Sequence, residues 1–512
     1  MFQYGIDHLT VTKSLSILNG KLPAILNNKA AEQVNKCHKE VMTIAQGNEV
    51  VYGINTGFGP LCSSKISQKD TLELQRNLLL SHSVGVGAPI DDKISKLMMI
   101  LKVHSLAKGY SGISLHILNR IIWHIENDVI PIVPGQGSVG ASGDLAPLSH
   151  LFLPLIGEGT VSYKGKILPT IEVLKICEME AVELSPKAGL ALTNGTQFIL
   201  AHAVFLVDKF YSCLSHADVM AALMIEGLMA SKMPFHPKLH RLRPYKGNIH
   251  VAERIDHFLN NSEISVSHAD CDRVQDPYSL RCVPQVHGSS RSAWLHLKNA
   301  VELELNSVTD NPIVFSERFT ISGGNFHGQP LALPIDYACL AVSELGNIAD
   351  RRIYLSLEGK TQNTPKLLMK STGLNSGFMI VQYTSAALAS ENKINCMPAS
   401  ADSIPTSLGQ EDHVSMGSIG VRKALKVCNN TEKILAIELI CAAQAIDFRK
   451  PLKASPILDK VHDLIRSNIS HATADRIFAN DINKAISIIQ LREILNITAT
   501  PNATNSQLFE QY

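Results

Sequence analysis

Apolar residues recur at intervals of three and four along most of the chain, which is the spacing of helices that bury one face. The helices predicted in this way cover residues 70–82, 92–106, 113–127, 196–229, 289–305, 336–357 and 421–448. Alternating strand patterns are sparse, and only residues 161–168, which turn at Lys164-Gly165, and 313–322 predict small hairpins. The pattern therefore predicts a mainly α fold.

One segment of the predicted helix 196–229 has no polar side. Residues 219–225, VMAALMI, are apolar all round, which is typical of a helix buried on every face inside a bundle. We therefore expect a long central helical bundle over residues 111–497. An N-terminal region, 1–110, precedes it, and the polar residues 498–512 are predicted to form a frayed tail.

Composition narrows the classes of partner. The chain has 512 residues, 45% of them hydrophobic and 18% charged, a slight apolar excess that is expected where subunit surfaces are also buried. Lys plus Arg total 47 and Asp plus Glu total 46. The chain therefore has no overall positive field that would attract nucleic acid or an anionic membrane. We expect an oligomer with no nucleic-acid or membrane partner.

The cysteines and the N-terminus bear on the compartment. The ten cysteines include no C-x-x-C pair, which argues against a zinc ribbon or a dense disulfide framework. The first residues lack a basic start followed by an apolar run, and the apolar stretch 434–445 is shorter than the roughly 20 residues that span a bilayer. These features predict a cytoplasmic protein.

Glycine and proline concentrate in three loops, 51–60, 131–143 and 322–330, where chemistry is to be sought. Residues 135–140, GQGSVG, match the G-x-G-x-x-G fingerprint of dinucleotide-binding turns. The helix that must open there would contain Pro147 and Pro154, and an interior proline costs about 3 kcal/mol. No nucleotide site is therefore expected.

The same loop continues into a more specific motif. Residues 137–148, GSVGASGDLAPL, resemble the signature of the aromatic amino acid ammonia-lyase family, which includes the histidine and phenylalanine enzymes. The resemblance implies that Ala141, Ser142 and Gly143 form 4-methylideneimidazole-5-one, because the Gly143 nitrogen attacks the Ala141 carbonyl and Ser142 loses water. It also implies a fumarase/aspartase-like helical architecture and a mechanism without pyridoxal phosphate or metal. Alone, a short Gly-Ser-Ala match would be a plain tight turn.

Two further motifs of the family lie on either side of this triad. Residues 51–59, VYGINTGFG, resemble its mobile active-site loop and place Tyr52 at the catalytic acid or base position. Residues 192–196, LTNGT, match its Thr-Asn-Gly segment, so Asn194 is expected to hydrogen-bond the electrophile or the substrate. Without the family, Tyr52 would be a half-buried aromatic and Asn194 a helix cap.

Two motifs follow in the second half of the chain. Residues 274–281, VQDPYSLR, correspond to a family segment that places Gln275, Tyr278 and Arg281 in the site, with Arg281 as the clamp for a substrate carboxylate. Residues 323–328, GGNFHG, match the segment whose phenylalanine packs beside the electrophile, here Phe326. Alone, Arg281 would be a surface or ion-pair arginine and Phe326 a core residue.

Two positions bear on the substrate. His82, after Ser81, resembles the ring-recognising position of the histidine enzymes, and Glu411 stands where phenylalanine and tyrosine enzymes usually carry Gln. A buried carboxylate can pair with an imidazole N–H but stays unpaired beside a phenyl ring. Histidine is therefore favoured, although residues 327–330, HGQP, resemble tyrosine aminomutases and residues 408–409, LG, replace a usual Ala-Asn.

The resemblance as a whole implies a lyase that converts L-histidine to trans-urocanate and ammonia. The substrate carboxylate would bind Arg281, its ring would lie between His82 and Glu411, and Tyr52 would remove a β-proton. The family also implies a homotetramer whose sites combine three subunits. The alternatives are a tyrosine ammonia-lyase or aminomutase, or a helical assembly protein that has lost activity.

Overall fold

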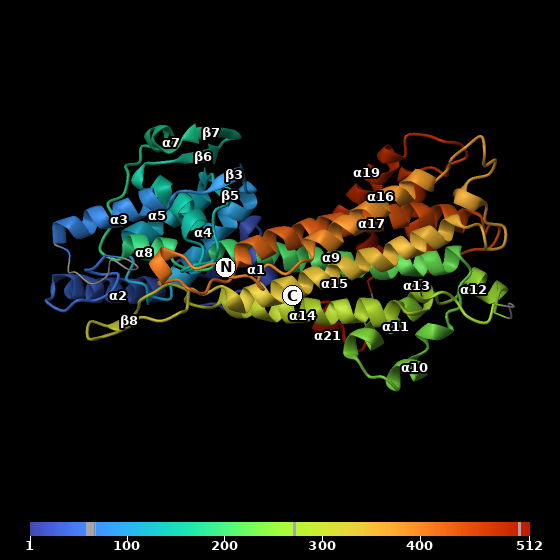
Figure 1. The fold of residues 1–512 in the computed structure, drawn as a ribbon, viewed down its shortest axis with the longest axis horizontal. Helices are drawn as coiled ribbons and strands as arrows, with labels where there is room; N and C mark the ends of the chain where they lie inside the picture. Colours follow the sequence, from blue (N-terminus) through green and yellow to red (C-terminus); the bar gives the residue numbers. More distant parts are fainter. Residues whose placement is uncertain (58–65, 67, 270–272, 500–502) are drawn as a thin grey trace.

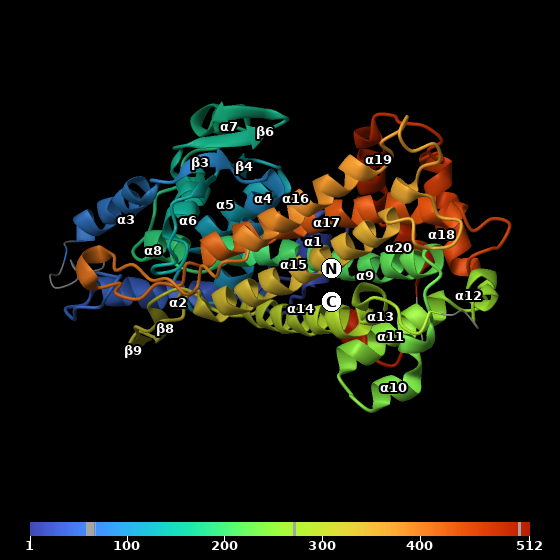
Figure 2. The same cartoon turned by 45° about the vertical axis from the view of Figure 1, so that its right-hand side comes forward.

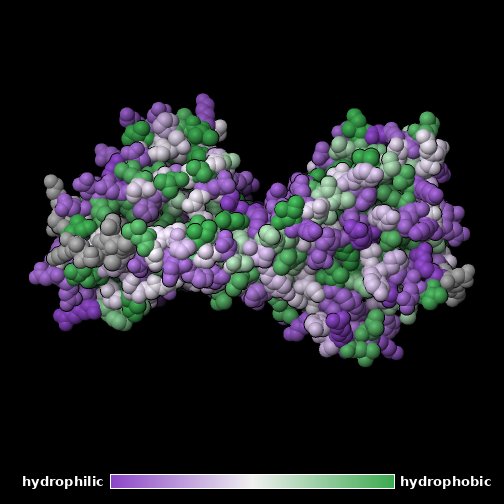
Figure 3. Space-filling view, in the orientation of Figure 1, coloured by the Kyte–Doolittle hydropathy of each residue, from purple (hydrophilic) through white to green (hydrophobic). Residues whose placement is uncertain are grey.

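The protein is elongated, with long helices running along its length (Figure 1). The computed structural model describes residues 1–57, 66, 68–269, 273–499 and 503–512. In the space-filling view two bulky ends are joined by a narrower waist (Figure 3). The mainly α prediction is confirmed, since strands form only four small sheets among these residues.

Five long helices form the central bundle that joins the two ends. They are α9 (Gln197–Gly227), α14 (Val283–Leu305), α15 (Gln329–Leu357), α16 (Met379–Asn395) and α17 (Gly417–Asp447). Helix α17 packs along both α9 and α15. All side chains of residues 219–225 in α9 are fully buried, so the prediction of a helix without a solvent face is confirmed.

Three bundle helices begin earlier than predicted, and the smallest difference is in α17, which starts at Gly417 and not at residue 421. Helix α14 starts at Val283, not at residue 289, and α15 starts at Gln329, not at residue 336. Pro284 and Pro330 lie in their first turns, where the missing N–H has no intrahelical partner to lose. Pro334 lies one turn further into α15.

Eight shorter helices gather at the end of the bundle where α9 begins (Figures 1 and 2). They are α1 (Val11–Leu18), α2 (Asn28–Gln46), α3 (Gln68–His82), α4 (Asp92–Leu106), α5 (Leu115–Glu126), α6 (Leu145–Phe152), α7 (Thr170–Ile176) and α8 (Ala188–Thr193). Thr10, Asn27, Asp91 and Ser114 accept hydrogen bonds from the first turns of α1, α2, α4 and α5, which stabilises these starts. The division of the chain at residue 110 stays a prediction.

The strands are short and lie mostly at the same end. They are β1 (Phe2–Gln3), β2 (Ala24–Ile25), β3 (Val86–Pro89), β4 (Ile130–Pro131), β5 (Pro134–Gln136), β6 (Thr160–Tyr163), β7 (Lys166–Pro169), β8 (Ile313–Ser316) and β9 (Phe319–Ile321). Both predicted hairpins, β6–β7 and β8–β9, are confirmed as antiparallel pairs. The beginning of the GQGSVG run lies in β5, which pairs with β3, and the next helix, α6, begins only at Leu145.

The remaining helices pack around the far end of the bundle. They are α10 (Pro237–Arg241), α11 (Lys246–Phe258), α12 (Glu263–Ser267), α13 (Tyr278–Arg281), α18 (Pro456–Asn468), α19 (Phe478–Gln490), α20 (Glu493–Ile497) and α21 (Ser506–Phe509). A buried charge cluster ties α11 and α14 to α9. The Asp218 carboxylate accepts hydrogen bonds from Arg254 Nε at 2.9 Å, His287 Nδ1 at 2.8 Å and Arg291 Nη2 at 2.5 Å.

The C-terminal residues 503–512 differ from the expected frayed tail. Phe509 is 2% exposed, and the Glu510 carboxylate accepts hydrogen bonds from His250 at 2.7 Å and Arg254 at 3.1 Å. The Tyr512 hydroxyl donates to Asp208 at 2.6 Å, and its ring contacts Trp294. Apolar and charged contacts that are distant in sequence therefore order this segment, although its composition is that of a loose end.

Two bundle helices are long and apolar enough to cross a membrane by length and composition. They are α9 and α15, and not the shorter stretch 434–445 considered in the sequence. In the apolar windows of α9 and α15, 78% and 67% of residues are buried inside the protein. Burial to this extent is typical of the core helices of a folded protein.

Candidate active site

A cavity of about 800 Å³ lies at the end of the bundle where α9 begins. Helix α3 contributes one face to it, because residues 74, 77, 78, 81 and 82 are three or four apart. The cavity brings together six of the residues predicted from sequence: Tyr52, His82, Ser142, Asn194, Phe326 and Glu411. These residues come from six separate segments of one chain.

The Ala-Ser-Gly triad forms a tight turn directly before α6. Ser142 and Gly143 both have positive φ, 51° and 80°. A Cβ on Gly143 would lie 2.2 Å from the Gly195 carbonyl oxygen, so only glycine fits there. The turn is thus compressed against the Asn194-Gly195 segment, and its serine faces the cavity.

Asn194 connects the triad to a buried lysine. Its side-chain Nδ2 donates to the Ser142 carbonyl oxygen at 2.6 Å, and its own carbonyl oxygen accepts from Lys102 Nζ at 2.6 Å. Asn194 Oδ1 is buried and has no hydrogen-bond partner among the residues described.

Asp144 follows the triad and is fully buried. Its Oδ2 accepts hydrogen bonds from the backbone N–H groups of Phe198 and Ile199, both at 3.0 Å, in the first turn of α9. Burial raises the pKa of Asp144 to about 7, although the hydrogen bonds from Ile199, Phe198 and Ser138 oppose this shift. Asp144 therefore fixes the triad to the beginning of α9.

Glu411 lies directly against the triad. Its Oε1 accepts a hydrogen bond from Ser142 Oγ at 2.5 Å, while Thr406 and Ser407 donate to Oε2 at 3.0 and 2.7 Å. His82 lies in the same cavity, and burial lowers its pKa although Glu411 raises it. A neutral imidazole and a carboxylate thus offer complementary partners to a small polar ring.

The loop that carries Tyr52 is held in its conformation by hydrogen bonds from side chains of the loop itself. Val51 N donates to Asn55 Oδ1 at 2.8 Å, and Asn55 Nδ2 donates to the Glu49 carbonyl at 2.8 Å. Gly53 has φ +70°, a conformation that glycine adopts without strain. The end of the predicted loop motif, Phe58 and Gly59, lies outside the described residues.

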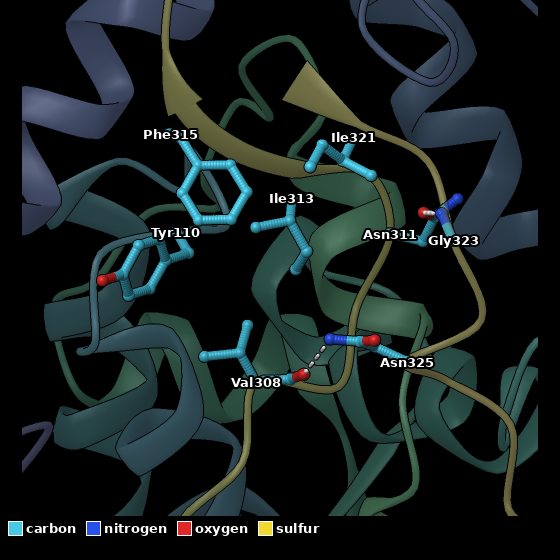
Figure 4. Close-up of a pocket in the computed structure, with 8 residues that line it drawn as sticks. All are labelled: Tyr110, Val308, Asn311, Ile313, Phe315, Ile321, Gly323 and Asn325. Atoms are coloured by element: carbon cyan, nitrogen blue, oxygen red, sulfur yellow. Dashed lines mark hydrogen bonds between the residues drawn. The ribbon is translucent and has the colours of Figure 1, made fainter. Parts of the chain in front are cut away.

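Phe326 lies on the connection between β9 and α15. Beside the candidate site, a second cavity of about 320 Å³ shares Asn311 and Gly323 with it (Figure 4). Its other lining residues are mostly apolar, and Asn325 Nδ2 donates to the Val308 carbonyl at 3.2 Å across it. Among the lining residues of this smaller cavity, only Tyr110 has an ionisable side chain. These residues support the loop that carries Phe326, and they present no evident chemistry.

The remaining predicted residues, Gln275, Tyr278 and Arg281, lie elsewhere. Arg281 donates to Gln275 Oε1 at 2.8 Å and to the Asp276 carbonyl at 2.9 Å, and its guanidinium lies over the Tyr278 ring. Gln275 and Arg281 line another cavity, together with Ser231 and Lys232 just beyond the end of α9. The 31 residues of α9 span roughly 45 Å at 1.5 Å per residue. One chain therefore does not bring this group to Ser142.

Sequence analysis missed several residues that hold the site together. Lys102, Thr406 and Ser407 contact Asn194 or Glu411 directly. A signal existed for Lys102, because it interrupts the apolar run 97–103, LMMILKV. No comparable signal marks Thr406 or Ser407. Within the described part of the chain, no group of three His, Cys, Asp or Glu side chains is arranged to hold a metal ion.

Known proteins resemble this chain in both sequence and structure. Residues 9–467 match the aromatic amino acid lyase family. Histidine ammonia-lyase of Vibrio cholerae is 44% identical over 468 residues, which are 91% of this chain and 92% of that protein. The crystal structure of histidine ammonia-lyase from Trypanosoma cruzi is similar with a TM-score of 0.91 and 38% identity, covering 99% of this chain and 97% of the other. Tyrosine aminomutase from Streptomyces globisporus has a TM-score of 0.91 at 32% identity, covering 97% and 98% of the two chains.

Proposed function

This chain belongs to the aromatic amino acid lyase family, and from that premise we propose that it eliminates ammonia from L-histidine to form trans-urocanate. The observation that carries this proposal is the position of Glu411, whose carboxylate contacts Ser142 in the cavity that also holds His82. A carboxylate in this position can pair with an imidazole N–H. Beside a phenyl ring the carboxylate would lose water without gaining a ring N–H donor, and only its bonds to neighbouring hydroxyl groups would remain, which is costly.

The residues at the triad fit the electrophile that the family resemblance implies. Only glycine can occupy position 143, and the Asn194 amide already donates to the carbonyl of residue 142. We propose that Ala141, Ser142 and Gly143 form 4-methylideneimidazole-5-one, with Asn194 holding its position and Phe326 packing beside it. When formed, this group supplies an electrophilic methylidene carbon that turns the substrate amine into a better leaving group.

The other residues bind the substrate and move its proton. His82 and Glu411 orient the imidazole, and Arg281, assisted by Gln275, binds the carboxylate. Tyr52 accepts the β-proton on its phenolate oxygen while the Cα–N bond breaks, so that a Cα=Cβ bond and ammonia result. Tyr278 acts beside Arg281 in catalysis. Since a tyrosine has an unperturbed pKa near 10, positive groups near Tyr52 must favour its ionised form.

We propose that complete sites form in a homotetramer. Arg281 lies at the opposite end of α9 from Ser142, so a second chain must deliver it. An apolar stripe on α15 supports such assembly, because Leu333, Tyr337 and Leu340 are 56%, 49% and 45% exposed at helical spacing.

We propose a cytoplasmic location for this enzyme. The eight cysteines in the described residues are free thiols. Among them, the Cys339 and Cys396 sulfurs lie 4.0 Å apart without a bond between them. Adjacent unpaired thiols are typical of a reducing compartment.

The test is absorbance at the urocanate, cinnamate and coumarate bands, with the purified protein given L-histidine, L-phenylalanine or L-tyrosine. We expect growth of the urocanate band alone. Glu411→Gln keeps the shape but removes the charge, so kcat/KM for histidine should fall about 10- to 100-fold, the value of a hydrogen bond to a charged group. Glu172→Gln, an exposed change on α7, is the matched control and should have no effect.

Other outcomes contradict the proposal in distinct ways. Product from tyrosine and not from histidine would make the protein a tyrosine ammonia-lyase or, if β-tyrosine accumulates, an aminomutase. No product from any of the three, with no loss of mass at the triad, would identify an inactive member of the family.

A further inference from the structure

Lys102 is a buried lysine without a carboxylate partner. It lies near the C-terminal end of α4, is 1% exposed, and no carboxylate of the described residues lies within 4.0 Å of its Nζ. Burying an ammonium group is costly unless it is paired or hydrogen-bonded. Its location therefore requires a physical explanation.

The hydrogen bonds of Lys102 lead to the triad. Lys102 Nζ donates to the Asn194 carbonyl at 2.6 Å and lies 3.5 Å from Gln197 Oε1. On the other side of the same residue, Asn194 Nδ2 donates to the Ser142 carbonyl at 2.6 Å. One residue further on, the Gly195 carbonyl accepts from Asp144 N at 2.7 Å. Lys102 thus holds, from behind, the segment that grips residues 142–144.

We propose that Lys102 is a positioning residue for the electrophile: its ammonium group holds the Asn194 backbone so that the Asn194 amide and the Gly195 carbonyl keep residues 142–144 in the geometry needed for cyclisation. The inference rests on the proposed function, because it takes from there that residues 141–143 cyclise. Lys102 itself contacts neither the cavity nor the substrate.

The second buried lysine of this region, Lys187, provides a contrast. Its Nζ pairs with Asp310 at 2.8 Å and also donates to the Ser111 carbonyl at 2.8 Å. Loss of Lys187 would leave a buried carboxylate without its partner, which destabilises the fold. Loss of Lys102 leaves no such charge. Burial lowers the pKa of Lys102 to about 7, although Asp310 opposes this shift. An apolar residue in its place leaves the Asn194 carbonyl without this donor but leaves no buried carboxylate without a partner.

The test is the mass of the intact full-length protein, since cyclisation with dehydration removes two waters, about 36 Da. Lys102→Met removes the donor but keeps the length of the side chain. We expect the fraction of chains that lose 36 Da to fall about tenfold, kcat to fall with it, and KM for histidine and the melting temperature to stay unchanged. Lys102→Arg keeps a cationic donor and should restore most of the cyclised fraction.

Lys96→Met, on the same helix, is the matched control, because the Lys96 ammonium group contacts only the exposed Asp128 among the described residues. It should cyclise like the wild type. Full cyclisation in Lys102→Met would overturn the inference. Failure of that variant to fold would also overturn it, by showing that Lys102 supports the fold and not the Asn194 segment. A wild-type protein without the loss of 36 Da would instead refute the proposed function.

Discussion

At the scale of single residues, the triad turn is closely packed against its neighbours on two sides. The triad turn touches Gly195 on one side, and Glu411 touches Ser142 on the other. Thr406 and Ser407 hold the second oxygen of Glu411. The carboxylate is thus pre-oriented, which would reduce the entropy lost on binding the substrate ring that we propose for it.

Gly143→Ala tests how closely the triad is packed. The new Cβ would lie 2.2 Å from the Gly195 carbonyl and would also be strained at φ +80°. We expect the purified variant to keep its full mass, without the loss of about 36 Da, and to show no lyase activity. Gly165→Ala is the control, because its φ is +76° but no atom lies within 4 Å of the added carbon. Cyclisation of Gly143→Ala to the wild-type extent would contradict this description of the turn.

At the scale of elements, segments distant in sequence hold one another in place. Helix α21 and the residues after it connect to α9, α11 and α14 through Glu510. Burial raises the pKa of this carboxyl, but the hydrogen bond from His250 and the charges of Arg254 and Arg291 outweigh burial and lower it to about 2. An ionised Glu510 therefore stabilises the folded state.

Glu510→Gln should reduce the free energy of unfolding at pH 7 by about 3 kcal/mol, the equivalent of lowering a pKa from 4.5 to about 2. Because the folded pKa is the lower one, this stabilisation is complete above pH 4.5 and is lost as the pH falls toward 2. Urea unfolding of both proteins between pH 7 and pH 2.5 measures it. The difference should shrink only below pH 4.5. Asp463→Asn, exposed on α18, is the control, and a constant difference at all pH values would argue against an electrostatic origin.

At the scale of the whole molecule, the long bundle separates two groups of predicted site residues. Tyr52 and Glu411 line one cavity, whereas Gln275 and Arg281 line another at the opposite end of α9. A rigid helix of 31 residues cannot bring its two ends together. Symmetric association of copies can do so, because it places the end of one chain beside the beginning of another.

Coexpression of two inactive variants tests this arrangement. If Tyr52 and Arg281 of one site come from different chains, Tyr52→Phe mixed with Arg281→Ala should recover up to about a quarter of the wild-type activity by random assembly. Tyr52→Phe mixed with Glu411→Gln is the control. Both residues line the cavity of one chain, so no site regains both and activity should stay at the level of the single variants. Equal recovery of activity in both mixtures would contradict a site shared in this way. So would the absence of recovery in both.

The sequence by itself determined most of the helices and predicted the chemistry proposed for the triad. The spacing of apolar residues records which side of a helix is buried, and for α4 it predicted the bounds Asp92–Leu106 without error. Cyclisation of Ala141, Ser142 and Gly143 involves neighbouring backbone atoms, so a short motif is sufficient to predict it. The helix starts just before Pro284 and Pro330 were missed because a proline in a first turn looks like a break.

Only the tertiary structure decided which distant residues meet. Glu411 contacts Ser142 across 269 positions, and Lys102 reaches Asn194 across 92. It also separated Arg281 from Ser142 by the length of α9 and ordered the C-terminal residues against the bundle. Periodicity describes only local burial, whereas these contacts depend on how whole helices pack, and packing is determined by many side chains together.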